Sequence, residues 1–131
     1  MLNFKKWFSK GDEQGLIINT PKEETGIFIL KVDNIHLGIL KHENGEWTFR
    51  YTDEFKKHVN EYNYIVGFQD LNKTYRSETL WPFFLIRIPG LKQPAVQEII
   101  KKENIDQENE VELLKRFGRK TIANPYELLP A

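Results

Sequence analysis

Side chains able to act as nucleophiles are few and isolated in this 131-residue sequence. The serines Ser9 and Ser77 have no motif around them that supplies an activating base and an orienting third group, as nucleophilic catalysis requires, and we predict that Ser77 caps a helix. The eight glycines are spread singly, so no loop is built to cradle phosphate. We therefore expect a non-catalytic protein without a nucleotide cofactor.

Metal-binding side chains are equally scattered. The chain has no cysteine, which excludes disulfides and thiolate metal sites. His36, His42 and His58 occur at spacings that match no usual metal pattern. Among the carboxylates, Asp70 in the segment Gly67–Leu71 stands in a context that indicates a fixed local role, as a turn or cap. We expect no metal and no other cofactor.

The charge balance argues against nucleic acid as a direct partner. Lysine and arginine total 19, as do aspartate and glutamate, and the only basic cluster is Arg116–Lys120, too little to grip a phosphate backbone. Two adjacent helices expected after residue 94 resemble a helix-turn-helix, but Glu108, Glu110 and Glu112 would repel DNA there. No stretch approaches the roughly 20 apolar residues of a membrane span. We expect a soluble, cytoplasmic protein.

The most informative feature is the apolar run from Leu80 to Ile88, which only Pro82 and Arg87 interrupt. Pro82 suits the first position of a helix and Pro89-Gly90 would end it, so we predict a short buried helix in preference to a strand. Two interpretations stay open. The run is a core element, or one of its large aromatic side chains reaches the surface of a partner, where such residues dominate binding energy.

The elements that must position this run begin with strands. Gly26–Val32 and Ile35–Leu40 flank the turn Asp33-Asn34 and predict a β-hairpin. Glu46–Tyr51 alternates strictly and predicts a third antiparallel strand with one solvent-facing side. Its apolar face is formed by Trp47, Phe49 and Tyr51.

Helices follow the strands. Each has a capping residue or a proline at its expected start and polar or glycine residues after its expected end. Strands first and helices later predict an α+β fold, with an antiparallel sheet packed against a C-terminal group of short helices. Besides the Pro82 helix, the expected helices run from Thr52 to Val59, from Pro94 to Asn104 and from Asp106 to Phe117.

We divide the chain into an N-terminal arm, residues 1–25, and a domain, residues 26–131. In the arm, the apolar residues of Met1–Phe8 could line one side of a short helix, and Leu16–Ile18 could form a short strand. Three interpretations of the first helix stay open: a helix that is frayed or docked on the core, a partner-docking arm, and a weak membrane-surface anchor.

Four segments of the sequence carry a recognisable order and spacing: Gly38 with Leu40, Gly45–Tyr51, Leu80–Phe84, and Val111–Arg119 with Leu128–Pro130. They resemble the N-terminal domain of HipA-like proteins, over about residues 26–131. In full-length HipA-like toxins this domain precedes a serine/threonine kinase core and helps to form contacts with the DNA-binding antitoxin. In split versions of the HipS type, a small protein that looks like this domain alone counteracts the separate kinase.

The sequence also departs from the family's pattern. Gly67–Tyr75 and Arg87–Gly90 differ from the usual segments around the Pro-Phe-Phe helix, and Thr121–Glu127 lacks the usual glycine. Nothing resembles the kinase's catalytic loop, metal-binding aspartate or ATP loop, so catalysis would reside in a partner. The departures flank the candidate contact surface, so they indicate a change in the partner or in the effect on it.

The resemblance implies an accessory, antitoxin-like protein that binds a separate HipA-like kinase, with the kinase's DNA-binding antitoxin as a further partner. The candidate partner-binding residues are Trp81 and Phe84, with Arg87 and Tyr75 beside them. One alternative is a structural or assembly module that bridges a DNA-binding transcription regulator through Met1–Phe8. A small enzyme of another type is a third hypothesis.

Overall fold

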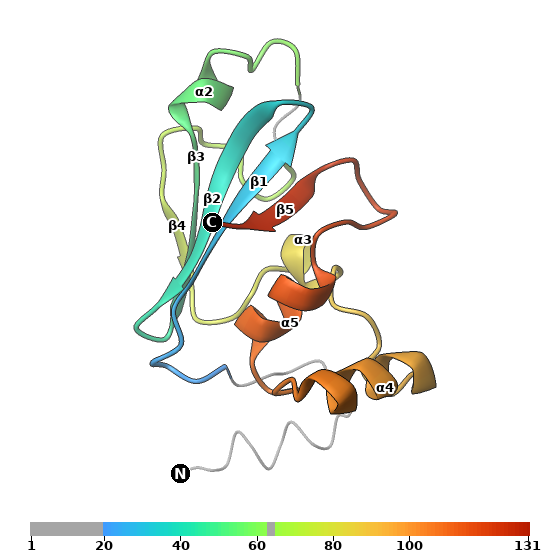
Figure 1. The fold of residues 1–131 in the computed structure, drawn as a ribbon. Helices are drawn as coiled ribbons and strands as arrows, with labels where there is room; N and C mark the ends of the chain where they lie inside the picture. Colours follow the sequence, from blue (N-terminus) through green and yellow to red (C-terminus); the bar gives the residue numbers. More distant parts are fainter. Residues whose placement is uncertain (1–19, 63–64) are drawn as a thin grey trace.

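The computed structural model describes residues 20–62 and 65–131, in which five strands and four helices form (Figure 1). The predicted helix in Met1–Phe8, the short strand Leu16–Ile18 and most of the N-terminal arm lie outside these residues. Within the described ranges, no helix is long and apolar enough to cross a membrane.

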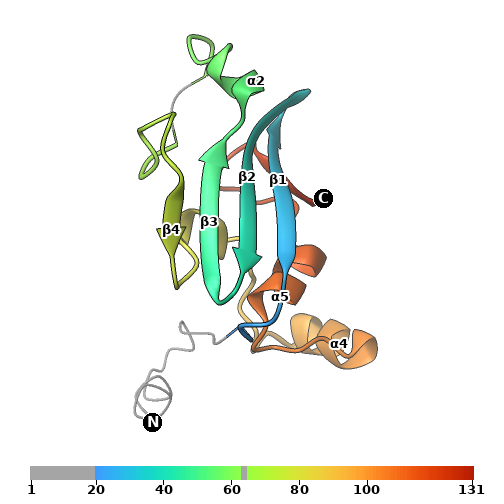
Figure 2. The same cartoon turned by 90° about the vertical axis from the view of Figure 1, so that its left-hand side faces the viewer.

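The strands form one antiparallel sheet in the order β4-β3-β2-β1-β5 (Figure 2). The predicted hairpin is confirmed as β1 (Gly26–Val32) and β2 (Ile35–Glu43). Asp33 between them has φ +54°, a left-handed conformation that aspartate tolerates better than most residues. The third predicted strand is confirmed as β3 (Glu46–Tyr51).

The two edge strands were not predicted. β4 (Tyr75–Ser77) pairs with β3, and β5 (Glu127–Pro130) pairs with β1. Three and four residues are too few to show a period of two in the sequence. The prediction that Ser77 caps a helix is wrong, because Ser77 pairs with Trp47 in the sheet and its Oγ accepts the Thr79 N–H at 3.1 Å.

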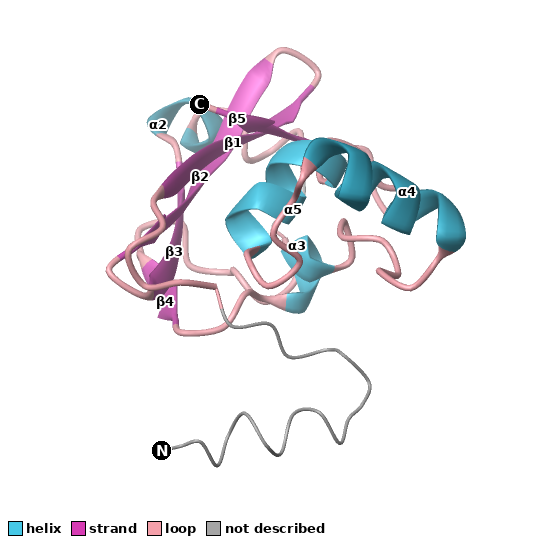
Figure 3. Ribbon diagram, turned by 60° about the horizontal axis from the view of Figure 1, so that its bottom comes forward, coloured by secondary structure: helices cyan, strands magenta, loops and turns pink. Residues whose placement is uncertain are grey.

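Helices α3 (Pro82–Leu85) and α5 (Glu110–Phe117) lie on one face of the sheet, and α4 (Pro94–Glu103) lies beside α5, farther from the sheet, as Figure 3 shows. The alternation of β3 is borne out, since its three aromatic side chains point into this layer and are at most 2% exposed. The α+β fold class is therefore confirmed. The helix predicted at Pro82 also forms, but it is a single turn that ends at Leu85, well before Pro89, and Phe84 is its one buried residue.

The other helices begin close to the predicted positions. Thr52 caps α2 (Asp53–Lys56), its Oγ1 accepting the Phe55 N–H at 3.1 Å, but the helix ends at Lys56, short of Val59. Helix α4 begins at Pro94 as predicted. It ends through Asn104, which adopts a left-handed conformation with φ +54°.

The predicted cap of α5 is wrong by three residues. Asn109 is the N-cap, and its Oδ1 accepts the N–H groups of Val111 at 3.0 Å and Glu112 at 3.2 Å. Asp106 instead closes a local turn by accepting the Glu108 N–H at 2.9 Å. A tertiary contact favours Asn109, because its buried amide also donates to Glu24 at 2.9 Å.

The start of α5 also meets the beginning of the described chain. The Thr20 hydroxyl accepts the backbone N–H of Glu110 at 2.9 Å and donates to the Glu110 carboxylate at 3.2 Å. The Glu110 side chain, in a residue only 5% exposed, receives a further hydrogen bond from Trp47. Burial raises the pKa of Glu110 to about 7, and these hydrogen bonds oppose the rise only in part.

This raised pKa predicts a decline of stability with pH. An unfolded glutamate loses its proton near 4.5, whereas folded Glu110 keeps it to about 7. Folding therefore takes up a proton, and stability present below pH 4.5 is lost as pH rises to 7, by about 3 kcal/mol. We expect Glu110→Gln to remove most of this decline in urea unfolding measured from pH 4.5 to 8. The exposed control Glu98→Gln should keep the wild-type profile, and parallel profiles for wild type and Glu110→Gln would contradict the prediction.

Candidate functional site

The four candidate residues are divided between the surface and the interior. Tyr75 in β4 and Trp81 at the start of α3 are half-buried. Phe84 is fully buried, and Arg87 is only 3% exposed. The three aromatic residues gather around a fourth, Phe68, whereas the guanidinium of Arg87 contacts a different part of the chain.

Phe68 is the centre of this aromatic cluster, although the sequence places it in a segment that reads as a polar loop. Its ring meets Tyr75 edge-on at 5.0 Å between centroids and Trp81 at 5.2 Å, a geometry that contributes about 0.5–1.5 kcal/mol per pair beyond area burial. On its other side lie Phe49 at 4.8 Å and Phe84 at 6.2 Å. Phe68 therefore connects the half-exposed rings to the core. In the sequence, the signal that could have identified Phe68 as a core residue is that it is an aromatic residue in a largely polar segment.

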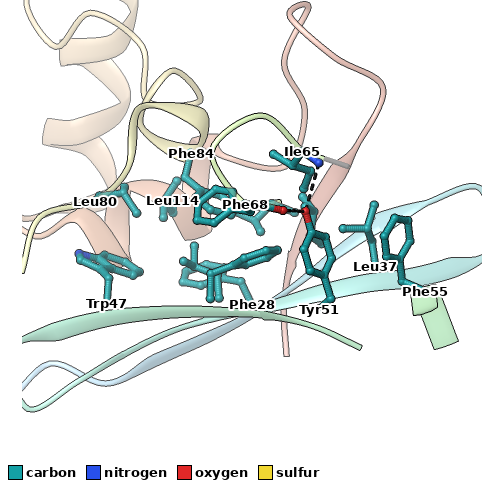
Figure 4. Packing of buried hydrophobic residues seen from close by; sticks show 14 of the residues in the cluster. Phe28, Leu37, Trp47, Tyr51, Phe55, Ile65, Phe68, Leu80, Phe84 and Leu114 are labelled. Atoms are coloured by element: carbon teal, nitrogen blue, oxygen red, sulfur yellow. Dashed lines mark hydrogen bonds between the residues drawn. The ribbon is translucent and has the colours of Figure 1, made fainter. Parts of the chain in front are cut away.

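The hydroxyl of Tyr51 fixes the backbone at Phe68 and at Ile65, three residues earlier (Figure 4). This hydroxyl donates to the Phe68 carbonyl and accepts the Ile65 N–H at 3.1 Å. Between these residues the chain makes a tight turn, in which the Phe68 N–H donates to the Ile65 carbonyl and Gly67 has φ +94°. A buried hydroxyl on β3 thus holds the turn that carries the central ring.

Tyr75 is held by the loop that precedes it. Its hydroxyl accepts the Asp70 N–H at 2.8 Å, and the Asp70 carboxylate accepts the Asn72 N–H at 2.9 Å. The local turn role predicted for Asp70 is confirmed. The Lys73 ammonium lies 4.9 Å from the centre of the Tyr75 ring, close enough for a cation–π contact. The Tyr75 ring is therefore held in place through its hydroxyl group, and the Lys73 ammonium covers part of it.

Arg87 forms a different structure at the other end of α3. Its guanidinium donates to four oxygens of the segment after α5, at 2.9–3.2 Å. No carboxylate among the described residues pairs with it, and its Nε has no hydrogen-bond partner there. The acceptors are the carbonyls of Gly118, Arg119 and Tyr126 and the side chain of Asn124.

Burial changes the pKa of Arg87. Desolvation lowers the pKa of Arg87 to about 10, so the side chain still carries its charge at neutral pH. Backbone dipoles, instead of a carboxylate, stabilise that charge. Arg87 therefore fixes the path of the chain from Gly118 to Tyr126 and presents little of itself to a partner.

A polar cleft of about 320 Å³ lies beside this segment. It is lined by two lysines and two carboxylates, Lys31, Lys120, Asp33 and Glu127, together with uncharged residues. Within the described ranges, no three histidine or carboxylate side chains are grouped so that they could hold a metal ion.

Removal of the Arg87 guanidinium should destabilise the domain. Arg87→Met keeps much of the apolar stem but leaves four oxygens without their donor, and we expect a loss of about 3 kcal/mol in the free energy of unfolding. Urea unfolding measures this loss. The control Arg116→Met removes an exposed ion pair with Glu103 and should lower the free energy of unfolding far less than Arg87→Met does, because solvent screens an exposed pair. Equal losses of unfolding free energy for the two variants would show that the buried contacts of Arg87 do not stabilise the domain.

Comparisons with known proteins identify the domain. No curated protein and no solved structure shows significant similarity to the chain. The family description "HipA N-terminal domain" matches residues 29–123, well over half of the chain. This match includes the last part of β1, strands β2 and β3, the aromatic cluster around Phe68, and helices α3 to α5. The chain belongs to the HipA N-terminal domain family.

Proposed function

We propose that this chain is a non-catalytic, antitoxin-like accessory protein that binds a separate HipA-like serine/threonine kinase and holds it inactive. The family match supports a HipA-related role. The observation that carries the proposal is the pair Tyr75 and Trp81, two large aromatic side chains that are half-exposed and backed by a fixed ring, Phe68.

Such a pair suits protein binding because the two side chains lose their conformational entropy when the domain folds, not when the partner binds. Tyrosine and tryptophan dominate the energy of many interfaces, and a side chain already held in place loses little entropy on binding. Trp81 rests on both Phe68 and Phe84, whose ring centroid is 6.4 Å from its own. In this proposal Trp81 and Tyr75 contact the kinase, whereas Phe84 packs α3 on the core and Arg87 joins the chain just after α3 to the segment that follows α5.

The test is binding to a HipA-like kinase core that lacks its own N-terminal domain. We expect the full chain to form a complex with this core and to suppress its kinase activity. Trp81→Ala should weaken the complex by about 2 kcal/mol, or roughly 30-fold in Kd, as truncation of a central aromatic contact does. Isothermal titration calorimetry measures the affinity, and thermal unfolding checks that each variant folds.

Phe117→Ala is the matched control, because Phe117 is a half-buried aromatic residue at the far end of α5. It should leave the affinity within about twofold. The proposal fails if the kinase core does not bind, or if the two variants weaken binding equally. Deletion of residues 1–19 addresses the alternative, a module bridging a transcription regulator through its arm. Kinase binding survives that deletion if our proposal is correct.

A further inference from the structure

The sheet face opposite the helices carries neighbouring aliphatic side chains that no described helix covers (Figure 2). Strand register places Ile39 of β2 beside Ile29 of β1, and Leu129 of β5 on the other side of Ile29. Ile27 lies two residues from Ile29 on β1 and is 42% exposed, while the other three are half-buried. We call these four residues the aliphatic patch.

The patch differs from the other exposed aliphatic residues of the domain. Val66 and Ile122 are 88% and 108% exposed and each sits singly in a turn, while Ile86, 51% exposed, is the C-cap residue of the short helix α3. Single exposed residues of this kind are ordinary on protein surfaces, whereas contiguous ones indicate a contact site. The patch is contiguous over three strands.

The dimensions of the patch suit one helix. Three adjacent strands at about 4.8 Å spacing span roughly 10 Å, and two residues along a strand add about 7 Å. An α-helix with its side chains is about 10 Å wide. The packing of a second sheet, or of a large globular face, would need a broader apolar surface than this one.

Two cations border the patch without a carboxylate partner. Arg50 of β3 is exposed and is the direct cross-strand neighbour of Ile39. Lys31 follows Ile29 by two residues on β1, on the same side of the strand. Among the described residues, neither forms an ion pair.

The nearby carboxylates are already engaged. Glu127, opposite Lys31, is shared by Arg119 at 3.4 Å and Lys120 at 3.8 Å. On the other side, Glu43 lies 3.0 Å from the ammonium of Lys41, and the remaining cation of this face, on β4, is paired in the same way with a glutamate of β3. Asp33, which lines the polar cleft with Lys31, accepts a hydrogen bond from the Tyr62 hydroxyl at 2.8 Å and forms no ion pair among the described residues. Even with Asp33 counted, the cations named around the patch outnumber the carboxylates, and this excess positive charge favours carboxylates on whatever covers the patch.

We infer that this sheet face is a docking site for an amphipathic helix of a protein partner, with acidic residues flanking its apolar stripe. The stripe packs on the aliphatic patch, and the carboxylates meet Arg50 and Lys31. The site lies on the opposite face of the sheet from Trp81, so it does not depend on the kinase being the partner of that residue.

The test uses the full chain and two synthetic helical peptides of about five turns, with leucines at identical positions and either glutamate or lysine elsewhere. We expect the glutamate peptide to bind at least about tenfold more tightly than the lysine peptide, and its affinity to fall as salt is raised. Fluorescence anisotropy measures both affinities. In methyl NMR spectra, the glutamate peptide should shift the signals of Ile27, Ile29, Ile39 and Leu129 and leave those of Ile86 and Ile122 unchanged.

Variants connect binding to the patch. Ile39→Thr, which keeps a β-branched residue in the strand, and Arg50→Glu should each weaken the glutamate peptide at least about fivefold. The controls Ile122→Thr and Lys101→Glu change an exposed aliphatic residue and an exposed lysine outside the patch and should stay within about twofold. The inference is overturned if neither peptide binds, if both bind equally, or if the controls weaken binding as much as the patch variants.

Discussion

The fold depends on the buried face of β3, where alternation places three aromatic rings in a row. Trp47 reaches the start of α5 through its hydrogen bond to the carboxylate there. Phe49 meets Phe68 at 4.8 Å and Phe84 at 5.5 Å, which joins the 65–68 turn and α3 to the sheet. Tyr51 holds the same turn by hydrogen bonds. The start of α5, the 65–68 turn and α3 are thus each anchored to a ring of one six-residue strand, and this explains how the one-turn helix α3 can be positioned firmly.

The row of rings imposes a constraint on the neighbouring strand. Gly38 of β2 pairs with Tyr51, and a Cβ at Gly38 would lie 2.5 Å from two atoms of the Phe49 ring. Real carbon atoms do not approach so closely, so any side chain at this position would displace Phe49. Because Phe49 supports Phe68 and Phe84, the displacement would reach the surface formed by Tyr75 and Trp81. The absence of a side chain at Gly38 therefore helps to shape the candidate contact surface on the far side of the core.

Local patterns predicted those parts of the fold that local physics decides. Alternation gave β3, the Asp33-Asn34 turn gave the hairpin, and prolines gave the starts of α3 and α4. Long-range contacts decided the rest. An arginine in an apolar run suggests a surface position, since arginine is seldom buried, yet Arg87 is buried because carbonyls some thirty residues later accept its hydrogen bonds. Phe68 could not be recognised as a core residue, because the Tyr51 hydroxyl that positions its backbone lies on β3, 17 residues earlier in the chain.

The edge of the sheet at β5 does not offer free N–H groups to a further strand. The outward N–H of Leu128 donates to the Arg119 carbonyl at 3.0 Å, and Pro130 has no N–H to offer. A further strand could not pair along this edge, so a partner cannot extend the sheet there. The side chains proposed for recognition lie instead on the two faces: the aromatic pair on the helical side, and the aliphatic patch on the open face. The two surfaces differ in chemistry, since one offers rigid aromatic rings and the other aliphatic groups bordered by cations. They are suited to different partner elements, and the domain could bind both at once without either one displacing the other.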